Sequence, residues 1–363
     1  MTLSVSGDSI TFPDLSTLQT APSGFGFKNR IINGDMRIDQ RNAGASVTPT
    51  ATGYTLDRWS LEVSQASKFS VQQNAGSITP PAGFTKYLGI TTVAAYTVGA
   101  SEAFNLRTFV EGYNFADMAW GTASAAPTTL SFWVRSSLTG TFGGSLRNDL
   151  NNRSYPFTYA ISAANTWEYK TITIAGDTAG TWATTTERGV GVMFGLGTGS
   201  TGSGTAGAWA AANYVSATGA TSVVGTSGAT FYVTGVQLEK GSTATAFDYR
   251  DYGRELIMCQ RYYYRIVGVS GYTTLLSGVS ASTTAAGQCA NPHPVQMRAA
   301  PTINIANLSS YNGVNNTNVT GISAQNSSVT NISVNLISSG LTIGQPQLIL
   351  GQANAFVDAS AEL

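Results

Sequence analysis

The 363-residue sequence is poor in charge. Charged residues make up 10% of it, against about a quarter of an average soluble domain, and Lys+Arg and Asp+Glu are equal at 19 each. With a formal net charge of zero there is no field to concentrate a phosphate-rich partner, so we expect no nucleic-acid binding. No run reaches the roughly 18 apolar residues of a membrane-spanning helix, so we expect no membrane insertion.

Histidine and cysteine are also scarce. His293 is the only histidine, and it lies between two prolines in a stiff turn that is typical of a structural role. A Ser/His/Asp or Cys/His arrangement would have to use it. Cys259 and Cys289 lack the spacing of metal ligands, so we expect two reduced thiols.

Glycoside cleavage needs only two carboxylates, so composition alone does not exclude a glycanase. Spacing across β-strands gives no way to select the pair, and we expect no enzymatic activity. A polysaccharide depolymerase stays open as an alternative. The eligible carboxylates are Asp35, Asp39, Asp57, Glu102, Glu111 and Glu239.

Short strand candidates separated by Gly- and Ser-rich turns fill residues 29–249. Within 129–136, Leu130, Phe132 and Val134 alternate with polar or bulky residues, which predicts a half-buried strand. The set is large enough for two packed antiparallel sheets. The other candidates are Trp59–Val63, Lys86–Thr92, Phe104–Val110, Trp167–Ile174, Val190–Phe194 and Thr230–Leu238. We expect residues 197–228, rich in Gly, Ser, Thr and Ala, to form a long surface excursion.

A short helix is predicted next, within a linker at residues 250–265. Asp251 can cap it, and four residues recur at intervals of four, three and four, which places them on one face. A stripe this short favours packing on its own domain, and packing between chains of an oligomer is the alternative. The stripe consists of Tyr252, Leu256, Cys259 and Tyr263.

The β pattern resumes in residues 266–363 and predicts a second, smaller sandwich. Residues 1–28 are too few to hold a core, so we expect them to lean on another chain or on the neighbouring domain. The C-terminal candidates are Tyr264–Val269, Thr273–Val279, Pro294–Arg298, Thr302–Ile305, Val329–Leu336, Gln347–Leu350 and Asn354–Ala359.

Aromatic residues in loop-like contexts are candidates for sugar contact, because flat rings stack on the apolar faces of pyranose units. Trp59 and Trp133 lie in strand patterns, so we expect them to be packed in the core. The glycan-binding candidates are Trp120, Trp182, Trp209 and Tyr214.

Three segments, in this order, resemble sequences of bacteriophage tail fibres. Residues 10–21 resemble a recurrent fibre motif, although Leu15 stands where that motif has glycine. Residues 29–42 are similar to the start of a phage jelly-roll module that resembles the carbohydrate-binding modules of glycoside hydrolases. Residues 255–264 resemble the start of the sandwich that follows such modules. Further matching segments are Asp57–Trp59, Ser131–Arg135, Gly235–Gly241, Ala246–Arg250, Pro294–Arg298, Ala300–Thr302 and Asp358–Leu363.

The resemblance implies an all-β chain in which a jelly-roll sandwich is followed by a short helix and a smaller sandwich. Its parts would be a virion-attachment segment (1–28), a carbohydrate-binding-module-like domain (29–249), the linker helix (250–265) and a C-terminal domain (266–363). In some relatives an early Asn-Gly-Asp and a late Gln-x-Glu hold a structural calcium ion, for which Asp35 and Glu239 would be the ligands here. We expect no other cofactor.

The resemblance also implies a function. We expect a structural subunit of a phage tail fibre or spike, a homotrimer that docks on other tail proteins and binds host cell-surface polysaccharide. It would be located in the virion tail after assembly in the host cytoplasm, in keeping with the lack of signal-peptide features near Met1. One alternative is a decoration or adaptor protein without receptor binding, and the other is the depolymerase.

Overall fold

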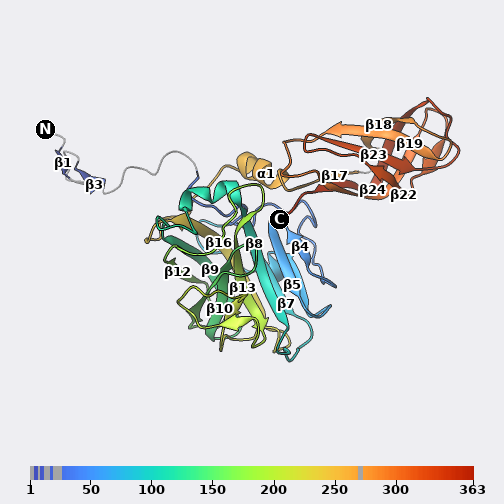
Figure 1. The fold of residues 1–363 in the computed structure, drawn as a ribbon. Helices are drawn as coiled ribbons and strands as arrows, with labels where there is room; N and C mark the ends of the chain where they lie inside the picture. Colours follow the sequence, from blue (N-terminus) through green and yellow to red (C-terminus); the bar gives the residue numbers. More distant parts are fainter. Residues whose placement is uncertain (1–3, 7–8, 12–16, 19–26, 269–272) are drawn as a thin grey trace.

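The computed structural model describes residues 4–6, 9–11, 17, 18, 27–268 and 273–363. The described chain is all-β, as predicted, with a jelly-roll sandwich, one α-helix and a smaller sandwich (Figure 1). Most of the predicted attachment segment lies outside the described residues. Its described part is a small antiparallel sheet of β1 (Ser4–Ser6), β2 (Ser9–Thr11) and β3 (Thr17–Leu18).

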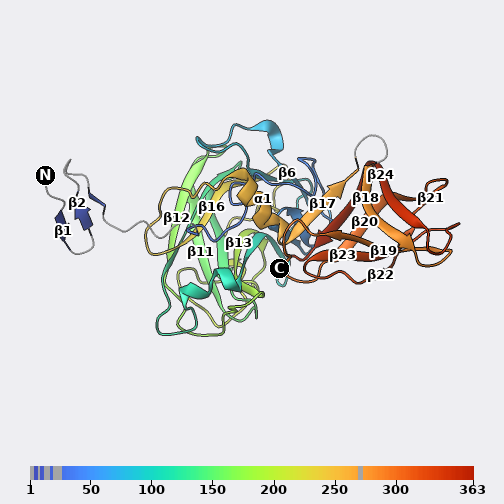
Figure 2. The same cartoon turned by 90° about the horizontal axis from the view of Figure 1, so that it is seen from above.

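Two antiparallel sheets pack against each other in the first sandwich (Figures 1 and 2). The six-stranded sheet has the order β11-β10-β13-β8-β5-β4, and the five-stranded sheet has the order β12-β9-β16-β7-β6. The six strands are β4 (Gly53–Leu56), β5 (Trp59–Val63), β8 (Ala103–Glu111), β10 (Gly140–Arg147), β11 (Ser154–Ile161) and β13 (Arg188–Thr198). The five are β6 (Phe69–Gln73), β7 (Leu88–Thr92), β9 (Thr128–Ser136), β12 (Glu168–Ile174) and β16 (Thr230–Lys240). Shorter elements are η1 (Ala75–Ser77), η2 (Gly112–Asn114), η3 (Ala116–Met118), β14 (Ser203–Gly204) and β15 (Ser216–Ala217).

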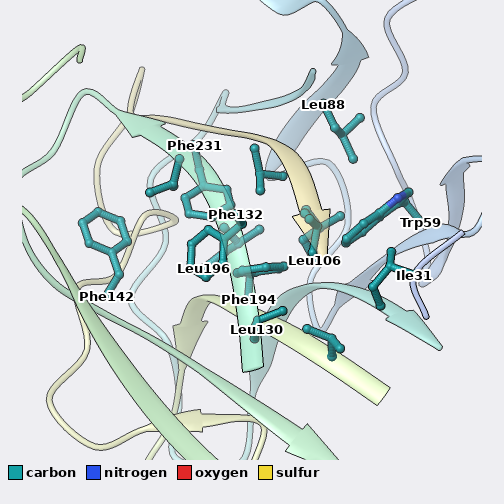
Figure 3. Close-up of a cluster of buried hydrophobic side chains, with 14 of the residues drawn as sticks. Ile31, Trp59, Leu88, Leu106, Leu130, Phe132, Phe142, Phe194, Leu196 and Phe231 are labelled. Atoms are coloured by element: carbon teal, nitrogen blue, oxygen red, sulfur yellow. The ribbon is translucent and has the colours of Figure 1, made fainter. Parts of the chain in front are cut away.

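The core lies between these sheets. Leu130, Phe132 and Val134 of β9 are fully buried in it, which confirms the predicted alternation. Phe132 meets Phe194 of the facing sheet edge to face, with ring centroids 4.9 Å apart (Figure 3). Each such side chain contributes about 1.5–3 kcal/mol by leaving water, so this core holds the two sheets together.

The sequence patterns missed some strands and misplaced others. β10 and β11 were not predicted. In β10, Gly143 and Gly144 interrupt the apolar pattern, yet a Cβ on Gly144 would lie 2.5 Å from the Phe157 ring. The predicted strand at 294–298 is not a strand in the structure. Residues 197–228 are only partly an excursion, because Val223 and Val224 join the core.

The smaller sandwich is one eight-stranded sheet that encloses its own core. Its central strand β24 pairs with β20 along one edge, and with β17 and then β18 along the other. The two strands predicted at 347–350 and 354–359 are therefore one. The strands are β17 (Tyr263–Val267), β18 (Thr273–Ser280), β19 (Ala285–Pro292), β20 (Thr302–Tyr311), β21 (Asn316–Asn318), β22 (Gly321–Gln325), β23 (Asn331–Ile337) and β24 (Pro346–Ser360).

Residues 29–42, hereafter the tie segment, form turns that are buried between other elements. The Asn33 side chain accepts a hydrogen bond from the Ile38 amide and donates to the carbonyls of Ile38 and Asp57. The Asn29 side chain accepts from the Leu238 amide and donates to the Val236 carbonyl. The Val236 amide donates to the Gly34 carbonyl at 2.8 Å, so the early Asn-Gly-Asp and the late Gln-x-Glu segments lie together.

The α-helix α1 (Tyr252–Gln260) lies at the junction of the two sandwiches (Figure 1). Asp251 caps it as predicted, accepting a hydrogen bond from the Arg254 amide at 2.9 Å. Only part of the predicted stripe faces inward: Leu256 and Cys259 pack in an apolar cluster with residues of both sandwiches. Tyr252 is 56% exposed and Tyr263 belongs to β17, because the helix ends at residue 260.

Buried ion pairs join the sandwiches beside this cluster. Glu362 pairs with Arg58 and with Arg41, and Arg41 also lies 3.5 Å from the centre of the Tyr263 ring. Arg261 holds Glu111 through two contacts, of 2.6 and 3.0 Å. Removing one partner of a buried ion pair leaves an uncompensated charge and lowers the free energy of unfolding by more than the pair contributes. These ion pairs therefore hold the two sandwiches together at the junction.

Gly34→Ala tests the tie segment. A Cβ at this position would lie 2.1 Å from the Val236 carbonyl oxygen, a backbone atom that cannot turn away. We expect urea unfolding to show a loss of about 3 kcal/mol. The control is Gly53→Ala, where a Cβ meets nothing within 4 Å. An equal effect of the two substitutions would contradict this role.

Asp57 predicts a pH dependence of stability. Burial raises its pKa to about 7, against the attraction of Arg41 and hydrogen bonds from Gln40. The folded state therefore binds a proton more tightly than the unfolded state, and the free energy of unfolding falls as pH rises from about 4 to about 7. Asp57→Asn removes this contribution and keeps that of Asp35, whose pKa burial also raises. We expect a flatter stability profile in urea titrations, and an unchanged profile would contradict the assignment.

Candidate functional site

The outward side of the five-stranded sheet carries exposed aromatic rings. Because residues alternate along β9, Trp133 lies on the opposite side from Phe132 and Val134. Tyr169 of β12 pairs directly with Trp133, and their ring centroids are 5.4 Å apart. Tyr169 is 43% exposed, so this pair presents ring surface to solvent.

A second group of rings comes from two loops that flank the sheet. Phe84 precedes β7, and Phe247 and Tyr249 follow β16. The three rings touch one another, with centroids 4.9, 5.1 and 5.5 Å apart. Segments more than 150 residues apart in sequence thus build one aromatic wall.

The two groups meet at Gly235 and enclose a hollow of about 430 Å³, hereafter the aromatic hollow. Gly235 has φ +61° beside a bulge of β16, and a Cβ there would lie 2.6 Å from Phe84 Cζ and 3.2 Å from Trp133 Cδ1. Only glycine leaves this space open. The hollow is lined by Ala82, Phe84, Ser131, Trp133, Tyr169, Gly235, Ala244, Thr245, Ala246, Phe247 and Tyr249, none of which is charged.

Hydrogen bonds from the buried part of the chain hold the loop that carries the second wall. Glu239 accepts from the amide of Thr245 at 2.9 Å and from its hydroxyl at 2.6 Å. The side chain of Gln237 accepts from the Asp248 amide at 2.8 Å. The Asn29 amide in turn donates to the Asp248 carboxylate. The hollow is therefore preorganised rather than formed by free loops.

The chemistry of the hollow suits an uncharged ligand that has both apolar faces and hydroxyl groups. Aromatic faces accept C–H surfaces, and hydroxyl and backbone groups along the lining can exchange hydrogen bonds. Its volume lies within the usual range of ligand pockets, about 300–1,000 Å³. No carboxylate or histidine belongs to the lining.

The predicted glycan-binding residues lie elsewhere. Trp120, Trp182 and Trp209 pack edge to face, with centroids 4.7–5.4 Å apart, and the first two are 6% and 7% exposed. Their indole N–H groups donate to backbone carbonyls. Tyr214 is half-buried over Gly204. This setting is typical of packing, and glycan contact at these four residues stays a prediction.

Trp133 was predicted to be packed in the core, and that was wrong. It is half-buried and lines the hollow. The alternation in residues 129–136 already placed it on the side opposite to Phe132, which was the signal that could have found it. The loop residues Phe84, Phe247 and Tyr249 carry no comparable sequence signal.

The two predicted calcium ligands are engaged with protein groups. Asp35 pairs with Arg37, whose guanidinium would repel a cation. Each carboxylate oxygen of Glu239 accepts a hydrogen bond from Thr245. Within the described part of the chain, no three His, Cys, Asp or Glu side chains form a group that could hold a metal ion. In this arrangement the two carboxylates do not fit a calcium ion. Calcium binding stays a prediction of the resemblance alone.

The remaining candidates for chemistry serve structural contacts. Asp57 and Glu111 belong to the junction, and Glu102 accepts hydrogen bonds from Gln65 and Tyr96. The Nε2 atom of the buried His293 donates to the Ser328 carbonyl at 2.9 Å, and its Nδ1 atom accepts from the Tyr264 hydroxyl at 2.7 Å. Burial lowers the pKa of His293.

Both cysteines are free and buried. Among the described residues, no helix is long and apolar enough to cross a membrane.

No family model and no curated protein matches the chain. Solved carbohydrate-binding modules with jelly-roll folds do match. A family 4 module is 14% identical over 57% of this chain and 97% of its own, with a TM-score of 0.29. A family 61 module in complex with β-1,4-galactotriose is 10% identical over 59% and 99%, with a TM-score of 0.30. A family 11 module of Clostridium thermocellum is 12% identical over 53% and 93%, with a TM-score of 0.26. TM-scores this low carry no argument about function.

Thermal unfolding with calcium chloride or EDTA tests the calcium prediction. A calcium ion at about 100 times its dissociation constant would stabilise the fold by about 2.7 kcal/mol. Because Asp35 and Glu239 are engaged with protein donors, we expect the same midpoint in both solutions, with magnesium chloride as the control. A midpoint raised by calcium alone would show that a site forms after all.

Proposed function

We propose that the first sandwich is a non-catalytic domain that binds an uncharged segment of polysaccharide in the aromatic hollow. The observation that carries this proposal is the hollow itself: five aromatic residues and no charged residue line a cavity of about 430 Å³ on a sheet face. A sugar chain offers the matching surface, because its pyranose rings are apolar on their faces and hydroxylated at their edges.

The arrangement of the rings supports binding along a chain rather than of a compact ligand. Trp133 and Tyr169 lie on rigid neighbouring strands, whereas Phe84 and its two partners stand on loops beyond Gly235. A ligand that spans both groups would stack on rings from each. Aromatic platforms fixed on strands lose little conformational entropy on binding.

We further propose that the chain is a subunit of a phage tail fibre or spike. The resemblance of residues 10–21, 29–42 and 255–264 to fibre sequences supports this, and with it a homotrimer attached to the tail through residues 1–28. Trivalent display would raise the avidity of a weak site for host cell-surface polysaccharide. A decoration or adaptor protein without receptor binding is the competing function.

Trp133→Ala and Tyr169→Ala test the proposal. Each removes a ring from the hollow, so we expect at least a tenfold loss of affinity for the best neutral oligosaccharide of a glycan array. Calorimetry on the purified full chain measures it. The matched control is Tyr113→Ala, which removes a ring that is 62% exposed outside the hollow and should leave affinity unchanged.

The same material separates the alternatives. If the wild-type chain binds no glycan and does not compete with virions for host cells, the receptor-binding role is contradicted. The decoration or adaptor role would then remain. Release of reducing sugar from host polysaccharide would point to a depolymerase instead. Equal loss in the Tyr113 control would show that the effect is not specific to the hollow.

A further inference from the structure

Three arginines gather on the outward side of the six-stranded sheet, away from the aromatic hollow. Leu106 and Leu146 of this sheet point into the core, so their neighbours Arg107 and Arg147 point outward. Arg147 lies opposite Gly191, which lies opposite Phe109 in the next strand. Arg107, Arg147 and Phe109 therefore share one side of the sheet.

The Phe109 ring is the centre of this cluster. The guanidinium of Arg188 lies 4.3 Å from its centroid and that of Arg107 lies 5.5 Å away. Gly191 lies between Phe109 and Arg147 in the sheet and has no side chain to separate them. A Cβ on Gly191 would lie only 3.0 Å from the Phe109 ring. Two guanidinium groups thus lie against one phenyl ring, and the register places Arg147 beside them on the same side of the sheet.

Two carboxylates offset part of this charge. Glu62 lies 3.2 Å from Arg107, and Asp149 lies 3.9 Å from Arg188. Arg147 has neither as an ion-pair partner within the described chain. Its Nη1 donates a hydrogen bond to the amide oxygen of Asn213, at 2.6 Å. The cluster keeps one positive charge in excess.

The unpaired state of Arg147 is unusual in this protein. Seven arginines have a buried Nε without a hydrogen-bond partner among the described residues, and six of them form ion pairs with carboxylates. Arg147 is the seventh, although it is only 6% exposed. Burial lowers its pKa to about 10 against the attraction of Glu62 and Asp149, and the nearby Arg107 and Arg188 add to the lowering. Buried charges are normally paired, because an unpaired one costs stability.

We propose that Arg147, with Arg107 and Arg188, forms a binding site for one oxyanion group, a carboxylate, phosphate or sulfate carried by a ligand. Guanidinium groups hold such groups through paired, charge-assisted hydrogen bonds. A single negative charge would neutralise the cluster. The whole chain has no net positive charge, so the site selects a local substituent rather than a polyanion. An acidic sugar or a phosphorylated glycan has this chemistry, and the site does not depend on the aromatic hollow.

Titration of the full chain tests this site. The probes are galacturonic acid oligomers, sodium phosphate and sodium sulfate, each compared with sodium chloride at equal ionic strength, with calorimetry as the readout. We expect saturable binding of at least one oxyanion and none of chloride. Tenfold tighter binding of the oligomers than of free phosphate would assign the site to an acidic sugar, and the reverse order to a phosphate group.

Substitutions locate the binding. Arg147→Gln should weaken it at least tenfold, and Arg188→Gln, whose side chain is one-third exposed and so tolerant of change, should weaken it as well. The matched control is Arg135→Gln on the other sheet, which should change nothing. Trp133→Ala should also leave oxyanion binding intact, so failure of this site and failure of the aromatic hollow are distinguishable. No saturable binding of any probe, or unchanged binding by the Arg147 and Arg188 variants, would overturn the proposal.

Discussion

The buried tie segment, residues 29–42, depends on side chains to satisfy its backbone. It has no strand or helix of its own, and buried amides and carbonyls must be paired. The Asn33 side chain pairs with the amide and carbonyl of Ile38, and the Asn29 side chain accepts from the Ile31 amide. The Trp59 indole donates to the Asn33 carbonyl from within the core. The segment lies where the first and last parts of the first sandwich come together. It therefore positions both the aromatic hollow and the junction with the second sandwich.

On one side the tie segment fixes the aromatic hollow. Asn29 donates to Asp248, and Lys28, next to it, donates to the Ala246 carbonyl. These contacts position the loop that carries Phe247 and Tyr249. On the other side the segment reaches the junction, where Arg41 binds Glu362. The binding surface and the angle between the sandwiches thus rest on one buried element, and a change in it would alter both.

The sequence predicted the parts of the fold that follow a local period. The alternation in β9 and the cap at Asp251 are local signals, and the structure confirms both. β10 was missed because close contacts select its glycines: Gly144 lies against Phe157 of the neighbouring strand, and Gly143 lies against Ser216, far along the chain. Local patterns do not report such contacts.

The sites were harder to predict than the fold for the same reason. Phe84 and Phe247 meet only after the chain has folded, and loop context drew attention instead to indoles such as Trp120, which is buried. In the sequence Arg147 does not differ from other strand arginines, and only the structure shows that its buried Nε has no hydrogen-bond partner among the described residues. Only the register of three strands reveals its neighbours.

A crystal structure of the full chain with the best neutral oligosaccharide from a glycan array tests the central claim most directly. The account predicts sugar rings stacked on Trp133 and Tyr169, with the chain passing Gly235 toward Phe84. Sugar bound instead at Trp209 and Tyr214, or at any surface outside the aromatic hollow, would contradict it.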